Sequence, residues 1–387
     1  MILSSRIRAT DAPPIPAARA WAARYDGRAG PALDLTQAVP GYPPPPELLA
    51  KLAEAAGCMT TAGYGPIAGD TALREALAAD IARFYGAPVG AAQVAITAGC
   101  NLAFAMAMQV LAAEGDSVLL PTPWYFNHHM ALTMQGVRAI PVPTRAEDGF
   151  VPDPARVAAL LAEHKARAVV LVTPNNPTGA IYPPEVIHAV AEVCRRHGAA
   201  LVLDETYRDF LPAGAPPHRL FDDPAWGERL VQLYSFSKAY CVPGHRLGAV
   251  AAGATFMAEF DKACDTYQIC PARPAQAAIA WAIPALRDWR DGNRALMAGR
   301  ARMFRDAVGQ LPGWRLDAIG TYFAYLRLPE GAPDALRAAE ILAAERGLMT
   351  LPGPFFGPGQ DRHLRLAFAN AAEAVLAQVP SRLAAFS

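Results

Sequence analysis

The chain has 387 residues, enough for two domains, and 53% of them are hydrophobic while 18% are charged, which favours a globular protein with a large core. Its 35 basic and 35 acidic side chains balance, so charge gives no reason to expect nucleic acid or an anionic membrane as a partner. Six scattered cysteines without a CxxC pair, and a first segment without an apolar core of signal-peptide length, predict a cytoplasmic protein with reduced thiols. The most apolar helix candidate, 102–113, is too short to span a membrane.

The first 45 residues predict an N-terminal arm. A helix is expected around 15–24, and the proline-rich segment AVPGYPPPP must be extended or kinked before a second helix at 47–56. Such an arm can cross onto a partner subunit, line a cleft or lie on the surface, and composition does not choose among these. The glycine-rich loop that follows, 61–70, contains Tyr64, a residue type that in such loops is more often packed than bound to a ligand.

A short strand at 93–97 leads through Gly99, Cys100 and Asn101 into an apolar helix. A strand, a glycine turn and a helix start direct backbone N–H groups and the positive end of the helix dipole at an anion. These three residues are therefore a candidate phosphate cradle, although many turns of this kind in α/β proteins bind nothing.

The next strand, 117–120, ends in PTPWYF, whose two prolines present Trp124 and Tyr125 at the edge of the sheet. Either ring could stack on a planar ligand, although a place in the core is the usual role of an aromatic residue. The two histidines at 128 and 129 lack the spacing and the companions of a metal site.

Further strands are predicted at 137–142 and 168–173, and the second ends in PNNPTG, which offers the amides of Asn175 and Asn176. The strand 199–204 ends in Asp204, and burying a carboxylate without a cation costs several kcal/mol. No lysine or arginine precedes Asp204 nearby, so a protonated heterocycle would be a suitable partner. Tyr207, three residues further on, could reach the same ligand.

The stretch 230–248, with the sequence LVQLYSFSKAYCVPGHRLG, combines an amine with phosphate-binding residue types. Its apolar run leads into Ser235, Ser237 and Lys238, and Arg246 follows eight residues after the lysine. The serines and the arginine could converge on a phosphate. The amine would then lie beside an anionic ligand as a nucleophile or base. These residues alone are equally compatible with the alternative that Lys238 is a solvated lysine that follows a strand.

The last hundred residues predict a smaller α+β domain, because strands at 321–328 and 363–368 alternate with helices. The predicted large domain covers residues 46–284. Residues 1–45 and 285–387 are expected to form the small domain with its N-terminal arm.

In the predicted strand HLRLAF, alternation places Leu364 and Leu366 on the core face and Arg365 on the opposite face. The arginine is therefore free to meet a carboxylate. The competing candidate, Arg362, lies in the loop before the strand and is expected to be solvated.

Together, the strand ends offer a lysine amine, a phosphate site with an arginine, a flat aromatic ring, an amide and a buried carboxylate without a cation. Pyridoxal 5′-phosphate matches all of them, because it has an aldehyde, a phosphate, a ring and a pyridine nitrogen. The motifs YGPIAG, TAGCN, PNNPTG, DETY, SFSKAYCVPGHRLG and RLAFAN occur in this order and resemble those of class I/II aminotransferases of the fold-type I group. The resemblance runs from Gln37 to Asn370. It implies an α/β fold with a mostly parallel seven-stranded sheet flanked by helices, and a smaller α+β domain.

The resemblance implies a role for each motif residue. Lys238 binds the cofactor aldehyde covalently and, once the substrate amine displaces it, moves the proton between the substrate α-carbon and the cofactor. Asp204 keeps the pyridine nitrogen protonated. Tyr207 and Asn176 bond the ring 3-oxygen, and Tyr125 stacks on the ring. The residues expected to hold the phosphate are Gly99, Cys100, Asn101, Ser235, Ser237 and Arg246.

The resemblance also implies how the substrate and a second subunit take part. Arg365 binds the α-carboxylate of the amino acid, helped by Asn176. Tyr64 reaches the phosphate of the neighbouring subunit, so a homodimer is the working unit. The chain differs from the family where Ala38 stands in place of a frequent glycine near the substrate carboxylate. Either Ala38 narrows that contact or Gly41 takes it over.

The implied reaction is transamination, in which an amino acid passes its α-amino group through the cofactor to a 2-oxo acid. A β-lyase or decarboxylase on the same scaffold is an alternative, and so is a non-enzymatic regulator, for whose added DNA-binding domain this chain has no room. No second arginine is recognisable as the partner of a side-chain carboxylate. An apolar pocket could instead be built from Tyr25, Trp124, Tyr322, Phe355 and Phe356. The expected amino donor is therefore aromatic or medium apolar.

Overall fold

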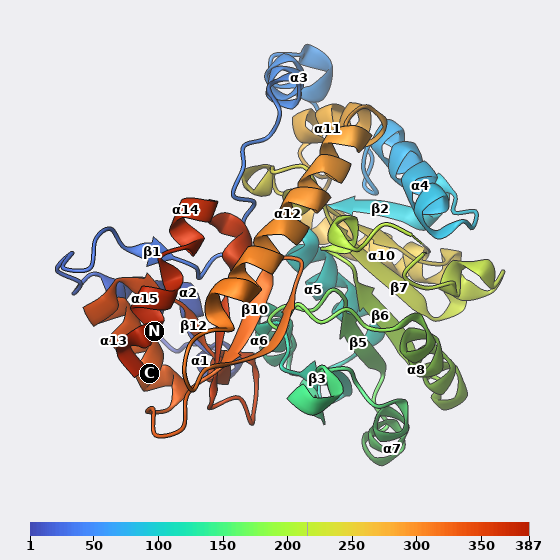
Figure 1. Cartoon of the computed structure of the whole chain (residues 1–387). Coiled ribbons are helices and arrows are strands. Elements are labelled where there is room, and N and C mark those ends of the chain that lie inside the picture. Colours follow the sequence, from blue (N-terminus) through green and yellow to red (C-terminus); the bar gives the residue numbers. More distant parts are fainter. Residues whose placement is uncertain (215, 387) are drawn as a thin grey trace.

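The structure of the protein, a computed structural model, describes residues 1–214 and 216–386 (Figure 1). Within these residues the larger sheet has seven strands in the order β2-β8-β7-β6-β5-β3-β4. Strand β8 is antiparallel to both neighbours, and the other pairs are parallel. The strands are β2 (Val94–Thr97), β3 (Ser117–Thr122), β4 (Arg138–Pro143), β5 (Ala168–Val172), β6 (Ala200–Asp204), β7 (Leu230–Ser235) and β8 (Gly248–Ala251). The predicted mostly parallel seven-stranded sheet is confirmed.

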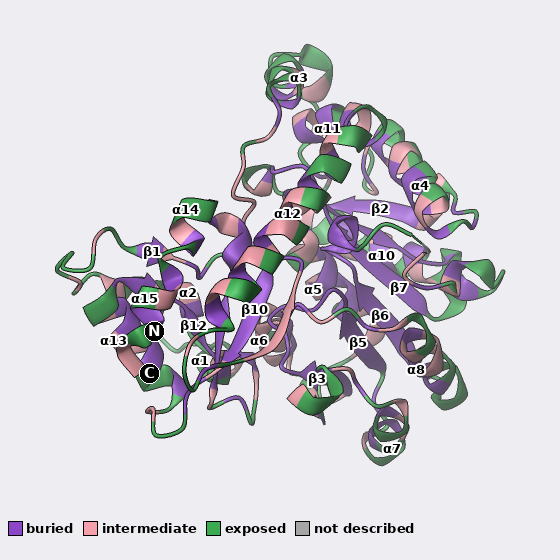
Figure 2. Ribbon diagram, in the orientation of Figure 1, coloured by how far each residue is buried: buried purple, intermediate pink, exposed green. Residues whose placement is uncertain are grey.

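Helices cover both faces of this sheet, because successive side chains of each strand point to opposite faces and both sets are apolar. Leu171 of β5 packs into one apolar layer and its neighbour Val170 into the other. The first layer includes α4 (Thr71–Tyr85), α7 (Pro154–His164), α8 (Pro184–His197) and α11 (Arg273–Ala285). The second includes α5 (Cys100–Leu111), α6 (Phe126–Gln135) and α10 (Ala254–Gln268). Burial on both faces explains why the strands are almost continuous apolar runs, which Figure 2 shows as buried arrows.

Local signals set the ends of several of these helices. The side chain of Asp153 accepts a hydrogen bond from the backbone N–H of Ala155 at 2.9 Å and so caps the start of α7. Gly136 and Gly198 adopt the left-handed conformation directly after α6 and α8, where a residue with a side chain would be strained. Helix ends at these positions bring each following strand back into the sheet.

A second, antiparallel sheet has the order β12-β13-β10-β9. Its strands are β9 (Arg315–Gly320), β10 (Phe323–Arg327), β12 (Leu351–Pro352) and β13 (His363–Leu366). Its apolar face packs against α12 (Arg287–Val308) and α13 (Ala335–Arg346), through Phe304 and Leu342 among others. The short strands β1 (Leu33–Asp34) and β11 (Leu348–Met349) form a parallel pair that ties the N-terminal segment to this part. The remaining helices are α1 (Ser5–Ala9), α2 (Pro14–Ala22), α3 (Pro46–Ala56), α9 (Phe236–Ala239), α14 (Glu373–Leu376) and α15 (Val379–Leu383).

The smaller sheet differs in detail from the prediction. The strand expected at 321–328 begins at Phe323, because Thr321 has a φ of 46° and belongs to the turn after β9. Strand β9 was not predicted, since its side chains are mostly half-buried and lack a clear alternation. Among the described residues, no helix is both long enough and apolar enough to cross a membrane.

Candidate active site

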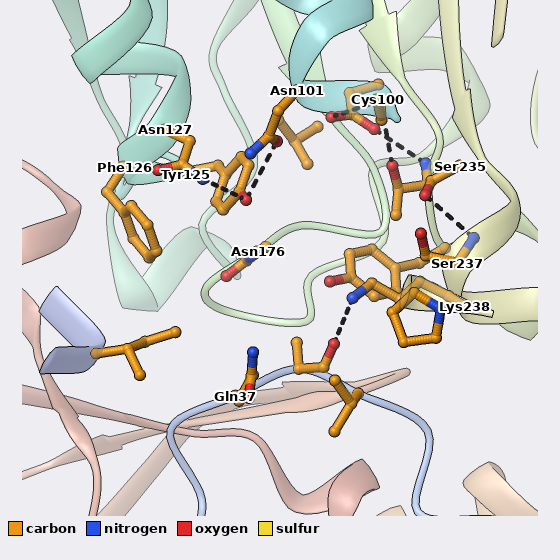
Figure 3. A pocket seen from close by; sticks show the side chains of 18 of the residues that line it. Gln37, Cys100, Asn101, Tyr125, Phe126, Asn127, Asn176, Ser235, Ser237 and Lys238 are labelled. Carbon is orange, nitrogen blue, oxygen red and sulfur yellow. Dashed lines mark hydrogen bonds between the residues drawn. The ribbon is translucent and has the colours of Figure 1, made fainter. Parts of the chain in front are cut away.

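A cavity of about 440 Å³ lies where β5, β6 and β7 end, at the carboxyl edge of the larger sheet (Figure 3). Val172, Asp204 and Ser235, the last residues of these three strands, all line it. Ligands of open α/β sheets bind at this edge. Of the residues singled out from the sequence, the cavity collects Ala38, Cys100, Asn101, Tyr125, Asn176, Asp204, Tyr207, Ser235, Ser237, Lys238, Arg246 and Arg365.

Lys238 reaches the cavity from α9, the single helical turn that follows β7. This turn is capped by Ser235, whose hydroxyl oxygen accepts a hydrogen bond from the backbone N–H of Ser237 at 3.3 Å. The Nζ atom of Lys238 donates to the backbone carbonyl of Ala38. Burial, together with the positive charges of Arg246 and Arg365, lowers the pKa of Lys238 to about 8. The amine is thus largely neutral, and nucleophilic, at mildly basic pH.

The turn between β2 and α5 approaches Arg246 so closely that only glycine fits. Gly99 has a φ of 93°, and a Cβ atom there would overlap Nη2 of Arg246. Gly248, the first residue of β8, also lies close to this turn, and a Cβ atom on it would lie 2.5 Å from the backbone nitrogen of Cys100. Arg246 donates from Nη1 to the carbonyl of Pro243 at 3.0 Å, and it forms no ion pair with any carboxylate in the described ranges. The guanidinium and the start of α5 therefore form a cationic cradle suited to a phosphate.

Asp204 ends β6 with its side chain buried at the cavity wall. Its Oδ1 accepts a hydrogen bond from the backbone N–H of Thr206 at 3.0 Å, and Nε2 of His128 lies 3.3 Å from its Oδ2. The imidazole of His128 stacks on Phe104, with ring centroids 3.9 Å apart. In the sequence, His128 lacks the companions of a metal ligand, and no other role was predicted for it. Its spacing of three residues after Tyr125, one turn along a helix that opens at the cavity, was the available signal.

Of the two adjacent aromatic residues, Tyr125 lines the cavity and Trp124 does not. The phenol oxygen of Tyr125 accepts a hydrogen bond from Nδ2 of Asn127 at 2.9 Å and donates to Oδ1 of Asn101 at 3.3 Å, as the dashed lines of Figure 3 show. Trp124 stacks on His129 instead, with ring centroids 4.8 Å apart. The two amides fix the orientation of the Tyr125 ring from its polar end.

Arg365 extends from β13 of the smaller sheet, and its side chain is buried at the cavity. Its Nη1 donates to Oδ1 of Asn176 at 3.1 Å, and its Nη2 donates to the carbonyl of Thr36. The guanidinium also lies against the rings of Phe323 and Phe356, 5.1 and 5.3 Å from their centroids. Burial lowers the pKa of Arg365 to about 10, which leaves it charged at neutral pH.

The expectation that Arg362 is solvated was wrong. Its Nη1 donates to the carbonyl of Ala332 at 2.7 Å and to that of Pro333 at 3.1 Å, and Nη2 reaches two further carbonyls. The side chain therefore holds the loop before α13 and does not line the cavity. A guanidinium with five donors can bind several carbonyls at once, which sequence position alone does not reveal.

Three further residues singled out from the sequence, Tyr207, Tyr64 and Ala38, lie in different surroundings. Tyr207 is buried beside Tyr322, with ring centroids 5.1 Å apart, and lines the cavity. Tyr64 is 82% exposed and lies outside the cavity of its own chain. Ala38 lines the cavity, whereas Gly41 donates its N–H to the carbonyl of Ala369 at 3.0 Å and packs against that carbonyl. Of these two residues, only Ala38 is among the described residues that line the cavity.

The aromatic pocket suggested from the sequence is not formed by the residues named for it. Tyr25 packs against Gly347, Tyr322 is fully buried, and Phe356 lies behind Arg365. None of these side chains, nor Phe355, lines the cavity. The apolar side chains that do line it are Ile15, Val39, Phe126 and Val172, together with prolines 13, 14, 16 and 243.

The donor set fits pyridoxal 5′-phosphate. An amine with a lowered pKa, a buried carboxylate, a glycine cradle with an arginine, and a tyrosine ring face one cavity, as the cofactor's aldehyde, pyridine nitrogen, phosphate and ring require. No group of three or more metal-ligating side chains occurs in the described part of the chain.

The chain matches the family described as aminotransferase class I and II over residues 31–383. It is 29% identical to the aromatic aminotransferase ISS1 of Arabidopsis thaliana, over 99% of this chain and 95% of that protein. It is 31% identical to the aspartate/prephenate aminotransferase of Thermus thermophilus, over 85% of this chain and 84% of the relative. The solved structure of an aspartate aminotransferase from Thermus thermophilus with maleate superposes with a TM-score of 0.90 at 27% identity, covering all of both chains. This chain therefore belongs to the class I and II aminotransferases, which are pyridoxal-phosphate-dependent enzymes.

Proposed function

We propose that this aminotransferase transfers the α-amino group of an apolar or aromatic amino acid to a 2-oxo acid, with Lys238 as its catalytic amine. The observation that carries the assignment is the position of this amine, which faces the same cavity as Asp204, Arg246 and Arg365 and has a pKa lowered to about 8. Of the four lysines of the chain, Lys238 alone lines this cavity.

Pyridoxal phosphate, when bound, supplies an aldehyde that binds amines and a ring that accepts electrons from the substrate α-carbon. Lys238 would move the proton between the substrate α-carbon and the cofactor, which a neutral amine can do above a pH of about 8. Asp204 would hold the proton at the pyridine nitrogen, and His128 positions the Asp204 carboxylate. The residues proposed to hold the phosphate are Gly99, Cys100, Asn101, Ser235, Ser237 and Arg246.

The remaining cavity residues are proposed to orient the cofactor and the substrate. Tyr125 would stack on the cofactor ring, and its two amide partners restrict rotation of the Tyr125 side chain. Asn176 accepts a hydrogen bond from Arg365 through Oδ1, so its Nδ2 would be free to donate to the ring 3-oxygen of the cofactor, together with the hydroxyl of Tyr207. Arg365 then binds the α-carboxylate of either substrate. Ala38 presents its carbonyl to Lys238 and limits the space beside the substrate carboxylate.

Borohydride reduction of the cofactor-loaded protein, followed by peptide mapping, tests the assignment of the amine. The label is expected on Lys238 in the wild type and is expected to be absent in Lys238→Ala, whose transamination falls by orders of magnitude. Lys262→Ala is the matched control, because Lys262 is exposed and pairs only with Glu259 at the surface. A label on another lysine, or full activity of Lys238→Ala, would end the proposal.

The aromatic preference has support from the cavity and from one relative. The lining apolar residues provide a neutral, apolar surface, and a relative covering 99% of the chain bears the name of an aromatic aminotransferase. A panel of amino donors with 2-oxo acid acceptors tests it. Turnover of aspartate far faster than phenylalanine would contradict the preference.

We also propose a cytoplasmic homodimer in which Tyr64 of each subunit completes the neighbouring phosphate site. Its 82% exposure, and the exposed Leu49, Met59 and Ile67 on nearby segments, support a contact surface there. Mixing inactive Lys238→Ala subunits with Tyr64→Ala subunits should restore activity, because one of the two mixed sites is then intact. Mixing Lys238→Ala with Arg246→Ala should not restore it, because both residues belong to the site of their own chain.

A further inference from the structure

Apolar side chains form part of the cavity wall next to Arg365. Phe126, the first residue of α6, lines the cavity and packs on Phe356, with ring centroids 5.9 Å apart. Phe356 in turn lies under the guanidinium of Arg365. A substrate whose α-carboxylate is held by Arg365 therefore has an aromatic wall beside it. Figure 3 shows Phe126 next to Tyr125 and on the opposite side of the view from Lys238.

Ile15 contributes to the same wall from the N-terminal segment. It lies in the first turn of α2 and packs on the apolar cluster that also contains Phe356 and contacts Phe126. The segment 11–16, which we term the strap, has the sequence DAPPIP and carries Ile15 across the cavity. Its prolines restrict φ, so little conformational entropy is lost when Ile15 is held there.

The strap is anchored at both ends. On one side, α1 packs on α6 and Arg6 pairs with Glu114, a residue of the turn before β3. On the other side, α2 packs on α13, and Nη2 of Arg24 lies 2.7 Å from a carboxylate oxygen of Glu340. Ile15 is therefore positioned by both the larger and the smaller sheet regions.

Each of the three cations that line the cavity is already assigned. Within the described ranges these cations are Lys238, the catalytic amine; Arg246, which is proposed to bind the phosphate; and Arg365, which is proposed to bind the α-carboxylate. A second carboxylate on a substrate side chain would lie against Ile15 and Phe126 without a charged partner from its own chain. An unpaired carboxylate in such surroundings is costly to desolvate.

We propose that Ile15 and Phe126 form one apolar subsite that accepts the side chains of both substrates, so that the amino donor and the 2-oxo acid acceptor are both monocarboxylic. This inference rests on the proposed transamination. A single Arg365 serves the α-carboxylates of both substrates, which bind in turn, so both side chains meet the same wall. The donor exchanges its C–N bond for C=O while the acceptor exchanges C=O for C–N, and no external oxidant is consumed.

Binding of non-reactive carboxylates to the cofactor-loaded enzyme tests the subsite without turnover. Titration calorimetry is expected to show that 3-phenylpropanoate binds more tightly than succinate. Phe126→Ala and Ile15→Ala should each weaken 3-phenylpropanoate about 10- to 100-fold while leaving propanoate little changed. Phe355→Ala is the matched control, because Phe355 packs on the same cluster but does not line the cavity. Equal losses in the control and in Phe126→Ala would overturn the inference.

Wild-type kinetics provide a second test that does not depend on folding of the variants. With phenylalanine as donor, kcat/KM for pyruvate or 4-hydroxyphenylpyruvate is expected to exceed that for 2-oxoglutarate by at least about 10-fold. A preference for 2-oxoglutarate would refute the monocarboxylic subsite while transamination itself stands. Absence of transfer from every donor would instead refute the proposed function.

Discussion

Oδ1 of Asn176 accepts a hydrogen bond from Nη1 of Arg365 at 3.1 Å, which joins the turn after β5 to strand β13 of the smaller sheet. Strand β5 belongs to the larger sheet and β13 to the smaller one, and the contact joins the two at one cavity. The smaller sheet thus contributes the guanidinium, and the larger sheet contributes the amine and the carboxylate. This arrangement leads to the following predictions.

Replacement of Arg365 by lysine should raise KM for the amino acid roughly 10- to 100-fold, with a smaller effect on kcat. A single ammonium cannot reproduce the two-pronged contact of a guanidinium with a carboxylate, and a charge-assisted hydrogen bond contributes about 1.5–3 kcal/mol. Steady-state kinetics measure this change. Arg362→Lys is the control and should leave KM unchanged, because its guanidinium binds loop carbonyls outside the cavity. An unchanged KM for Arg365→Lys would mean that another residue binds the α-carboxylate.

Asp204→Asn should reduce kcat by at least about 100-fold while the protein still binds the cofactor, because loss of one partner from a buried charge pair costs about 3–5 kcal/mol. Glu205→Ala is the contrasting variant. Glu205 is buried away from the cavity and accepts from the hydroxyl of Tyr85 and from Nε2 of Gln232, each at 2.5 Å. The Glu205→Ala substitution should therefore lower Tm rather than kcat. A near-wild-type rate for Asp204→Asn would assign the ring nitrogen another partner.

Gly99→Ala should weaken cofactor binding by at least about 10-fold, measured by equilibrium titration of the cofactor-free protein. The added methyl group meets Nη2 of Arg246, and the φ of 93° strains any residue other than glycine. Gly244→Ala is the matched control from the neighbouring loop, since a Cβ atom there meets open space. Similar affinities for the two variants would show that the phosphate binds elsewhere.

The lowered pKa of Lys238 predicts a pH dependence of stability in the cofactor-free protein. Below pH 8 the folded and unfolded chains both carry the proton, and folding bears the full cost of a desolvated charge. Between about 8 and 10.5 the unfolded chain binds more protons than the folded one, so the free energy of unfolding rises with pH. The rise should be on the order of 3 kcal/mol, because one pKa unit corresponds to about 1.4 kcal/mol.

Chemical denaturation at several pH values tests this dependence. Lys238→Met should be more stable than the wild type below pH 8, and the difference should disappear towards pH 10.5. Lys262→Met, which removes an exposed lysine, should follow the wild-type curve. If Lys238→Met also followed the wild-type curve, the amine would have an ordinary pKa.

Much of the fold and many cavity residues could be predicted from the sequence, because their signals are local. Continuous apolar runs identify strands that are covered on both faces, and a polar residue at the end of such a run must lie at the edge of the sheet. Asp204, Ser235 and Lys238 are found at the cavity for this reason. Alternation along β13 likewise separated Arg365 from the core-facing leucines on either side of it.

Tertiary structure alone decided which distant side chains meet. The contact of His128 with Asp204 and the apolar wall of Ile15 and Phe126 join elements that periodicity treats separately. A pattern assigns a residue to a face of a helix or strand. What that face touches depends on how helices, sheets and the strap pack together, and the free energy of that packing is spread over contacts between segments far apart in the chain.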